Sequence, residues 1–348
     1  MPRPLPPRST RRQFLAAALA GAAAAPLGLP SLAAETAPAP ATARLNRKLV
    51  MKCATITPES FPYVDGLRRW KELAEARTGG MLEMQVFHTA QLGDERRINE
   101  GILAGSVQAG IGAGAWAGYV PAYNVVELPF LIKDLSHMYR LADGKLGAQI
   151  AEQAEAKGFK VLAYYSAGDQ HFQTRSRPVR SLADIQGLKV RVIENKALVE
   201  SFRALGAVPA PLPYPQIYTA LQQGTVDGTA NDLLSVTSLK LYEVAKYLTW
   251  SSYVAEPRPL IVATSFFNEL PSDFQAVLLQ TARESAVYER KAFEDKAASA
   301  KQEAEKGGMS FLTLSDREKW VDRVRPVWEE FGKSTPGAAG MIREIQEG

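Results

Sequence analysis

The stretch "GLKVRVIENKALVESFRALG", residues 187–206, has the pattern of a β-strand followed by an α-helix. Apolar and charged side chains alternate over its first part, as in a strand with one buried face. The second part has helical spacing, and Gly206 is a typical helix-ending residue. On this strand Arg191 points away from the apolar face. It is either a solvated residue or the anchor for an anionic ligand, and the stretch alone leaves both open.

Strand and helix patterns alternate along the chain on both sides of this stretch. Strands are predicted at residues 48–56, 81–88, 107–113, 160–167, 188–193 and 225–230. Helices are predicted at residues 66–78, 94–105, 195–206 and around 218–222. Such alternation is typical of βαβ units with a mostly parallel sheet. Because the pattern restarts near residue 160, we predict two α/β lobes of similar size.

Residues 272–306 contain no Gly or Pro and are rich in Ala, Glu, Lys and Gln. Ser272 is a suitable N-cap, and Gly307 with Gly308 is a suitable stop. At 1.5 Å per residue such a helix is roughly 50 Å long, which exceeds the diameter of one lobe. We therefore predict that it lies across both lobes. Two helices joined near Ser285 are the alternative.

Residues 1–34 have the features of an export signal. A basic start is followed by an Ala/Gly-rich, modestly apolar stretch and then small residues, as in a secretory signal peptide. The pair Arg11-Arg12 resembles a twin-arginine signal. A membrane anchor is the alternative, but the apolar part is short and is interrupted by Pro26 and Pro30. The sequence predicts a cleaved signal and a periplasmic mature protein that does not insert into the membrane.

The charge of the chain gives no reason to expect a nucleic-acid partner. Four of the 41 basic residues lie in the leader, which has no acidic residue, so the remaining 37 balance the 37 acidic residues. A pI near 9.0 therefore reflects the leader. A neutral mature chain lacks the basic surplus that polyanion binding requires.

Familiar catalytic and metal-binding patterns are missing from the sequence. It contains no G-x-S-x-G, H-E-x-x-H, P-loop or C-x-x-C, and its three histidines lack ligand spacing. Residues 110–115 match G-x-G-x-x-A, but Pro121 would cut short a helix there, which favours close backbone contact over a dinucleotide site. Cys53 is the only cysteine and is predicted to be a buried strand residue. We expect no catalytic residues, metal or cofactor, and a ligand in an interlobe cleft.

Three segments resemble the substrate-binding proteins of tripartite ATP-independent periplasmic (TRAP) transporters, the DctP-like family. They are "HTAQLGDERR" (88–97), "VVELPFLIKD" (125–134) and, most specifically, "RALGAVPAPLPYPQIYTALQQGTVDGTAN" (203–231). The resemblance covers essentially the whole mature chain. It implies a two-lobe, type II-like periplasmic binding protein fold with a long helix spanning both lobes. Lobe I is expected at 35–168 plus about 257–296, and lobe II at 169–256 plus about 297–348.

The same resemblance implies a function and partners. The protein is expected to bind an organic acid and to deliver it to TRAP membrane permease subunits, which an ion gradient drives. A binding protein that feeds a chemoreceptor or a sensor kinase is one alternative. An exported enzyme is the other.

The family motifs also imply binding residues. The arginine of the "GLKxRV" strand, here Arg191, pairs with a ligand carboxylate in this family, and its guanidinium suits two parallel hydrogen bonds. The asparagine after "DGxx", here Asn231, contacts the ligand or else caps the next helix. Tyr214 either lines the pocket or is a core aromatic residue.

Other candidates lie where the chain departs from the family pattern. His171 stands where many members have a second arginine, which argues against a ligand held by two arginines. Gln170 or His171 is expected to hydrogen-bond polar groups of the ligand, unless the histidine is structural. Trp116 either stacks on the ligand or packs in the core. Arg258 either replaces the missing cation or is exposed to solvent.

Overall fold

The computed structural model describes residues 47–348. The leader at residues 1–34 and its cleavage site lie outside the described residues. In the described part, no helix has both the length and the hydropathy needed to cross a bilayer.

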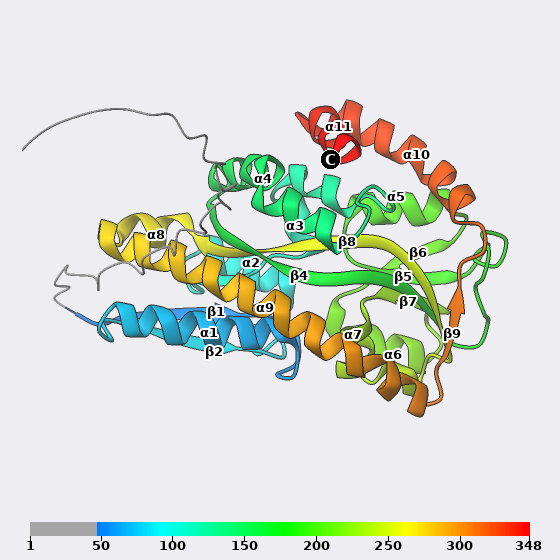
Figure 1. Cartoon of the computed structure of the whole chain (residues 1–348), viewed down its shortest axis with the longest axis horizontal. Coiled ribbons are helices and arrows are strands. Elements are labelled where there is room, and N and C mark those ends of the chain that lie inside the picture. The colour runs from blue at the N-terminus through cyan, green and yellow to red at the C-terminus, as the bar shows by residue number, and fades with distance from the viewer. Residues whose placement is uncertain (1–46) are drawn as a thin grey trace, which may run out of the picture. The chain divides into compact units, whose positions relative to one another are not determined.

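Strands and helices alternate along most of the described chain (Figure 1). The strands are β1 (Leu49–Ala54), β2 (Leu82–Phe87), β3 (Ala109–Ile111), β4 (Phe159–Thr174), β5 (Lys189–Val192), β6 (Val208–Pro211), β7 (Gly228–Asn231), β8 (Tyr247–Ala263) and β9 (Ser310–Thr313). The α-helices are α1 (Pro62–Arg77), α2 (Glu95–Leu103), α3 (Leu135–Asp143), α4 (Lys145–Glu155), α5 (Lys196–Ala204), α6 (Ile217–Gln222), α7 (Leu233–Ser238), α8 (Thr264–Glu269), α9 (Ser272–Lys306), α10 (Arg317–Ser334) and α11 (Ala338–Glu347). Short 3₁₀ helices are η1 (Gly114–Gly118), η2 (Pro121–Glu127), η3 (Tyr214–Gln216) and η4 (Leu241–Glu243).

The strands form one mixed sheet in the order β2-β1-β3-β8-β4-β7-β5-β6, and β9 pairs with β8. The predicted strand positions are confirmed, but the prediction of a mostly parallel sheet is wrong at its centre. There β8 runs antiparallel to both β3 and β4, and β4 runs antiparallel to β7. The sequence does not predict strand β8, because its segment, "YLTWSSYVAEPRPLIVA", contains two prolines and lacks regular alternation of apolar and polar residues.

Strands β4 and β8 connect two groups of parallel strands that run in opposite directions. The group β1–β3 joins the sheet at the carboxyl end of β8, whereas β7 pairs with β4 at residues 171–174. The carboxyl ends of the two groups therefore face each other at the middle of β4. The β4–β8 register is irregular there, between Ser166 and Asp169 and again between Gln170 and Phe172.

Two hydrophobic clusters cover the two faces of this sheet. Neighbouring residues of β4 separate between them, with Tyr164 in one cluster and Tyr165 in the other, as strand alternation requires. The first cluster takes side chains from η1, η2, α3, α4, α5, α10 and α11. The second takes side chains from α1, α6, α7, α8 and α9, and includes Cys53, which is fully buried in β1 as predicted.

The long helix is confirmed as one continuous element, α9, of 35 residues. It packs against α1, β4 and α7, and Figure 1 shows it crossing the long strands obliquely. Gly307 and Gly308 follow its end as predicted. The capping prediction is wrong by one position, because Ser272 is the first helical residue and Pro271 occupies the N-cap without a side-chain hydrogen bond.

Gly66 in α1 is a point of close contact with β4 and α9. A Cβ atom built on Gly66 would lie 2.7 Å from the Tyr165 ring and 2.9 Å from the Cβ of Glu289. Gly332 in α10 is a matched contrast, because a Cβ there would meet Ile342 at an ordinary 3.5 Å. Only the first position is closed to a methyl group by packing.

We therefore predict opposite effects of the same substitution at these two positions. Gly66→Ala lowers the free energy of unfolding by about 1–3 kcal/mol, because overpacking outweighs helix propensity. Gly332→Ala raises it by up to about 1 kcal/mol through helix propensity alone. Denaturant unfolding followed by circular dichroism measures both. Equal stabilisation by the two variants would contradict the packing of α1 against α9 described here.

Candidate ligand-binding site

A cavity lies where the carboxyl ends of the two strand groups meet. Segments after β1, β3, β5, β6 and β7 contribute to its wall, together with the middle of β4 and of β8. Carboxyl ends of strands are the usual position of ligand sites in open α/β sheets. The cavity volume, about 60 Å³ for the centres of water molecules, exceeds the roughly 10–15 Å³ that one water needs. The space is therefore large enough for several waters or a small ligand.

Five of the seven residues predicted from sequence line this cavity: Gln170, Arg191, Tyr214, Asn231 and Arg258. They come from separate strands and loops and are brought together only by the sheet. The other two, Trp116 and His171, lie outside its wall.

Arg191 is the main charged donor of the site that lacks an acidic partner. It is only 1% exposed, and its Nε donates to the carbonyl of Leu212 at 2.9 Å. Its Nη1 has no hydrogen-bond partner, and no carboxylate among the described residues forms an ion pair with it. Burial lowers the pKa of Arg191 to about 10, so it remains charged at neutral pH. A buried, charged donor without an acceptor is a strong indication of a site for an anion.

Hydrogen bonds to the chain hold three neutral side chains in place in the wall. The hydroxyl of Tyr214 donates to Ser235 Oγ at 3.1 Å. Asn231 accepts at Oδ1 from the Thr229 hydroxyl at 2.7 Å. Asn231 does not cap the following helix, because the N-cap of α7 is Asp232. Gln170 donates from Nε2 to the carbonyl of Ala167 at 3.0 Å.

Arg258 is neither exposed nor free to replace a second family arginine. Its side chain is 7% exposed, and its guanidinium contacts Glu256 and also Glu127 at 3.4 Å. Burial, followed by the charge of Glu256, raises the pKa of Glu127 well above its usual range. Arg258 therefore lines the cavity as a cation already compensated by Glu256.

Trp116 lies outside the cavity wall, and its position in this structure agrees with the core-packing alternative. Its side chain is fully buried and packs edge-to-face on Tyr123 and Phe159, at centroid distances of 5.2 and 5.9 Å. The indole of Trp116 is largely apolar, and this core buries more of its surface than the wall of a hydrated cavity would.

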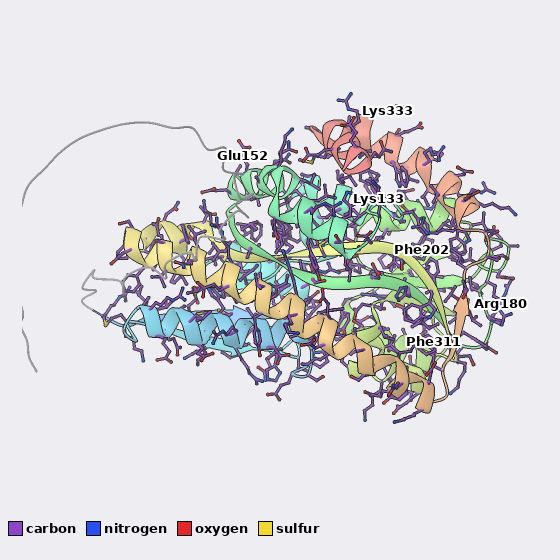
Figure 2. All side chains as sticks on the ribbon, in the orientation of Figure 1. Lys133, Glu152, Arg180, Phe202, Phe311 and Lys333 are labelled. Atoms are coloured by element: carbon purple, nitrogen blue, oxygen red, sulfur yellow. The ribbon has the colours of Figure 1, made fainter. Side chains whose placement is uncertain are left out.

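His171 also lies outside the cavity wall, and its contacts agree with the structural alternative. Its ring packs edge-to-face on Trp250 at 4.4 Å, and Nδ1 accepts from the backbone N–H of Ser252 at 3.2 Å. Phe311 of β9, which Figure 2 labels, stacks on the same Trp250. Burial lowers the pKa of His171 to about 3, so the ring is neutral at physiological pH. This position supplies no second cation, as the sequence predicted.

Two carboxylates in the wall, Glu95 and Asp232, were not predicted. Glu95 Oε1 accepts from the backbone N–H groups of Ala113 at 2.8 Å and Trp116 at 3.2 Å. Asp232 caps α7 by accepting from the backbone N–H and the hydroxyl of Ser235. Burial raises the pKa of each carboxyl to about 6. The sequence gives little sign of a binding role for either residue, because an acidic residue before or at the start of a helix usually indicates a helix cap.

The segments after β3 and β5 touch each other across the cavity, although three strands separate β3 from β5 in the sheet. A Cβ atom built on Gly114 would lie 2.1 Å from Ile193 Cγ2 and 3.0 Å from Ile193 Cβ. Asn195 Nδ2 donates to the carbonyl of Gly114 at 3.4 Å. Arg96 approaches Glu194 at 3.9 Å nearby. The neighbour of Gly114 is thus a side chain, whereas the close backbone approach predicted for the Gly-rich segment 110–115 is found at Gly110, where a Cβ would lie 3.2 Å from the carbonyl oxygen of Ala54.

Comparison with known proteins agrees with this geometry. The family model described as bacterial extracellular solute-binding protein, family 7, matches residues 53–335. The chain is 30% identical over 296 residues to the C4-dicarboxylate-binding periplasmic protein DctP of Rhodobacter capsulatus, covering 83% of this chain and 88% of the relative.

Two solved structures of TRAP periplasmic solute-binding proteins share the fold. The protein from Roseobacter denitrificans, with bound β-D-glucuronate, has a TM-score of 0.83 and 31% identity, covering 85% of this chain and 99% of its own. The protein from Polaromonas sp. JS666, bound to D-erythronate, has a TM-score of 0.83 and 30% identity, covering 86% and 98%. The predicted two-lobe α/β fold is confirmed. This chain therefore belongs to family 7 of the bacterial extracellular solute-binding proteins, the DctP-like receptors of TRAP transporters.

Proposed function

We propose that this protein binds an organic acid through one carboxylate and delivers it to a TRAP membrane permease. The observation that carries the proposal is the buried guanidinium of Arg191, which has an unpartnered Nη1 in the wall of the cavity. A ligand carboxylate supplies both the countercharge and the missing acceptor. Asn231, Tyr214 and Gln170 then contact the rest of the ligand.

The ligand class proposed is a hydroxylated acid. The structures similar to this chain hold β-D-glucuronate and D-erythronate, and both molecules combine a single carboxylate with several hydroxyl groups. The cavity wall includes hydroxyl, amide and carboxylate side chains that can hydrogen-bond such groups. The receptor binds and releases this acid without making or breaking a covalent bond in it.

The proposed binding cycle is closure of two lobes around the acid. The boundaries proposed are residues 35–168 plus about 257–296 for lobe I and the remaining mature chain for lobe II. Both crossing strands change register at this boundary, between Ser166 and Asp169 of β4 opposite Pro257 and Ala255 of β8. Irregular strand pairing is a suitable place for a hinge. The contact of Gly114 with Ile193 would then form on closure.

The proposed route to the periplasm is export through the twin-arginine leader, followed by cleavage near residue 34. The Arg11-Arg12 pair and the Ala-rich segment behind it support this route. Amino-terminal sequencing of the exported protein tests the cleavage position, and replacement of both arginines by lysine tests the route.

Replacing Arg191 should separate ligand binding from folding. Arg191→Met removes a buried charge without a partner, so the free protein should be at least as stable as the parent chain. The same change should weaken binding of D-glucuronate or D-erythronate at least about 100-fold, since loss of a buried charge partner costs about 2–5 kcal/mol. Thermal shift measures stability, and titration calorimetry measures affinity.

Lys189→Met is the matched control, because Lys189 is an exposed cation on the same strand. It should leave the affinity unchanged. Normal acid binding by Arg191→Met would show that the carboxylate is held elsewhere.

A methyl group at Gly114 should oppose closure. Its backbone is outside the left-handed region, so Gly114→Ala is barred by Ile193 rather than by conformation. We expect ligand dissociation to be about 5–150-fold faster, the equivalent of the 1–3 kcal/mol that overpacking costs. Stopped-flow displacement of the bound acid measures this rate.

Gly118→Ala in the same 3₁₀ helix is the control, because a Cβ there has no neighbour within 4 Å among the described residues. If Gly114→Ala and Gly118→Ala release the acid at the same rate, the contact with Ile193 plays no part in closure.

A further inference from the structure

The charges around the cavity are unequal in number and in pairing. Two arginines line it, Arg191 and Arg258, and the charge of Arg258 is compensated by Glu256 behind it. Against the single uncompensated cation stand four carboxylates in the wall: Asp94, Glu95, Glu194 and Asp232. The single uncompensated cation can neutralise one ligand carboxylate, whereas the wall carboxylates repel a second one.

Glu95 and Asp232 are the two wall carboxylates that lie in the most desolvated surroundings. Burial is the largest influence on each, and it raises the pKa of each to about 6. Each also interacts electrostatically with Arg258, and Glu95 does so with Arg191. Glu194, by contrast, has a side chain that is 32% exposed and approaches the exposed Arg96 at 3.9 Å, and Asp94 accepts the backbone N–H of Arg97 as the N-cap of α2. Charge repulsion inside the cavity is therefore concentrated at the first pair.

We propose that Glu95 and Asp232 determine specificity, by accepting hydrogen bonds from ligand hydroxyl groups and by excluding acids with a second carboxylate. This inference rests on the proposed function, because it assumes that Arg191 holds the first carboxylate. It assigns to this chain a preference opposite to that named for its C4-dicarboxylate-binding relative.

Both carboxylates also have structural roles, and these do not require a negative charge. Glu95 accepts backbone N–H groups at the start of η1, and Asp232 accepts the N–H of Ser235 at the start of α7. The amide oxygens of Gln and Asn accept the same backbone N–H groups. In Asp232→Asn the Nδ2 group replaces Oδ2, so its bond with the Ser235 hydroxyl reverses, with Nδ2 donating to Ser235 Oγ. Glu95→Gln and Asp232→Asn therefore remove charge while they preserve the bonds to the backbone, which separates specificity from folding.

The test uses two acids that differ only at one end. D-Erythronate and meso-tartrate have the same four-carbon skeleton, with a terminal hydroxymethyl group in the first and a second carboxylate in the second. Calorimetric titration at pH 8 should give the parent chain a dissociation constant for D-erythronate at least about tenfold lower than for meso-tartrate, the size of one partly screened like-charge contact.

Each substitution, Glu95→Gln or Asp232→Asn, should reduce this ratio by about tenfold, and the double variant should lose the preference or reverse it. Glu100→Gln is the control: it removes the same charge from the same helix α2 at an exposed position outside the cavity, so the ratio should stay unchanged. A role limited to folding would change both affinities together and leave their ratio intact.

A pH profile gives an independent readout. The preference should be complete near pH 8, where both carboxyls are charged, and should weaken as the pH falls through about 6 towards 5 and they take up protons. The other charged or titratable groups that face the cavity or Arg258 are Tyr63, Asp94, Tyr123, Glu127, Arg191, Glu194, Tyr214, Glu256 and Arg258. The double variant lacks the charges of Glu95 and Asp232, so its pH profile contains only the contribution of these other groups and the protonation of tartrate. Its profile is therefore subtracted from that of the parent chain.

The outcomes separate the two proposals. Normal D-erythronate binding by Arg191→Met would overturn the proposed function. Loss of binding in Arg191→Met, with an unchanged ratio in Glu95→Gln and Asp232→Asn, would overturn only this inference. Equal or tighter binding of meso-tartrate by the parent chain, or no binding of either acid, would overturn it as well.

Discussion

The antiparallel pairing of β4 with β8 is the constraint on which the rest of this structure depends. These two strands, of 16 and 17 residues, are long enough to carry a group of parallel strands at each end. Because the two groups run in opposite directions, their carboxyl ends converge on the middle of the pair. The helix α9 packs on β4 from one face and meets α1 at Gly66 too closely to admit a methyl group. The position of the cavity is a consequence of this topology.

Electrostatics then decides what the cavity can hold. Charged groups taken out of water need partners, and the chain supplies them to Arg258 in the form of Glu256 and Glu127. It supplies none to Arg191, whose Nη1 is left without an acceptor. The free protein thus keeps an incomplete ion pair. Binding of an acid completes this ion pair. The ligand carboxylate is therefore expected to lie beside Arg191, which fixes the orientation of the ligand in the cavity.

The sequence predicts best those site residues that lie in short motifs of fixed spacing. Arg191 and Asn231 lie in family motifs of fixed spacing, and both line the cavity. Trp116 is a candidate from the position of a family loop and His171 from that of a second family arginine, and both pack in the interior, against Tyr123 and Trp250. Glu95 and Asp232 were missed because each resembles an ordinary helix-capping acid. Nothing in a local sequence window distinguishes a cap that faces solvent from one that faces a ligand.

The sequence by itself determined the strand and helix segments with regular periodicity, the single long helix at 272–306 and the balance of charge in the mature chain. These are properties of neighbouring residues, and hydrophobic period, glycine stops and composition encode them directly. The tertiary structure alone decided that β8 pairs antiparallel with β3 and β4, that Arg258 is compensated, and that Gly114 meets Ile193. Pairing partners and charge neutralisation depend on residues that are distant in sequence, so only the folded chain brings them within reach of one another.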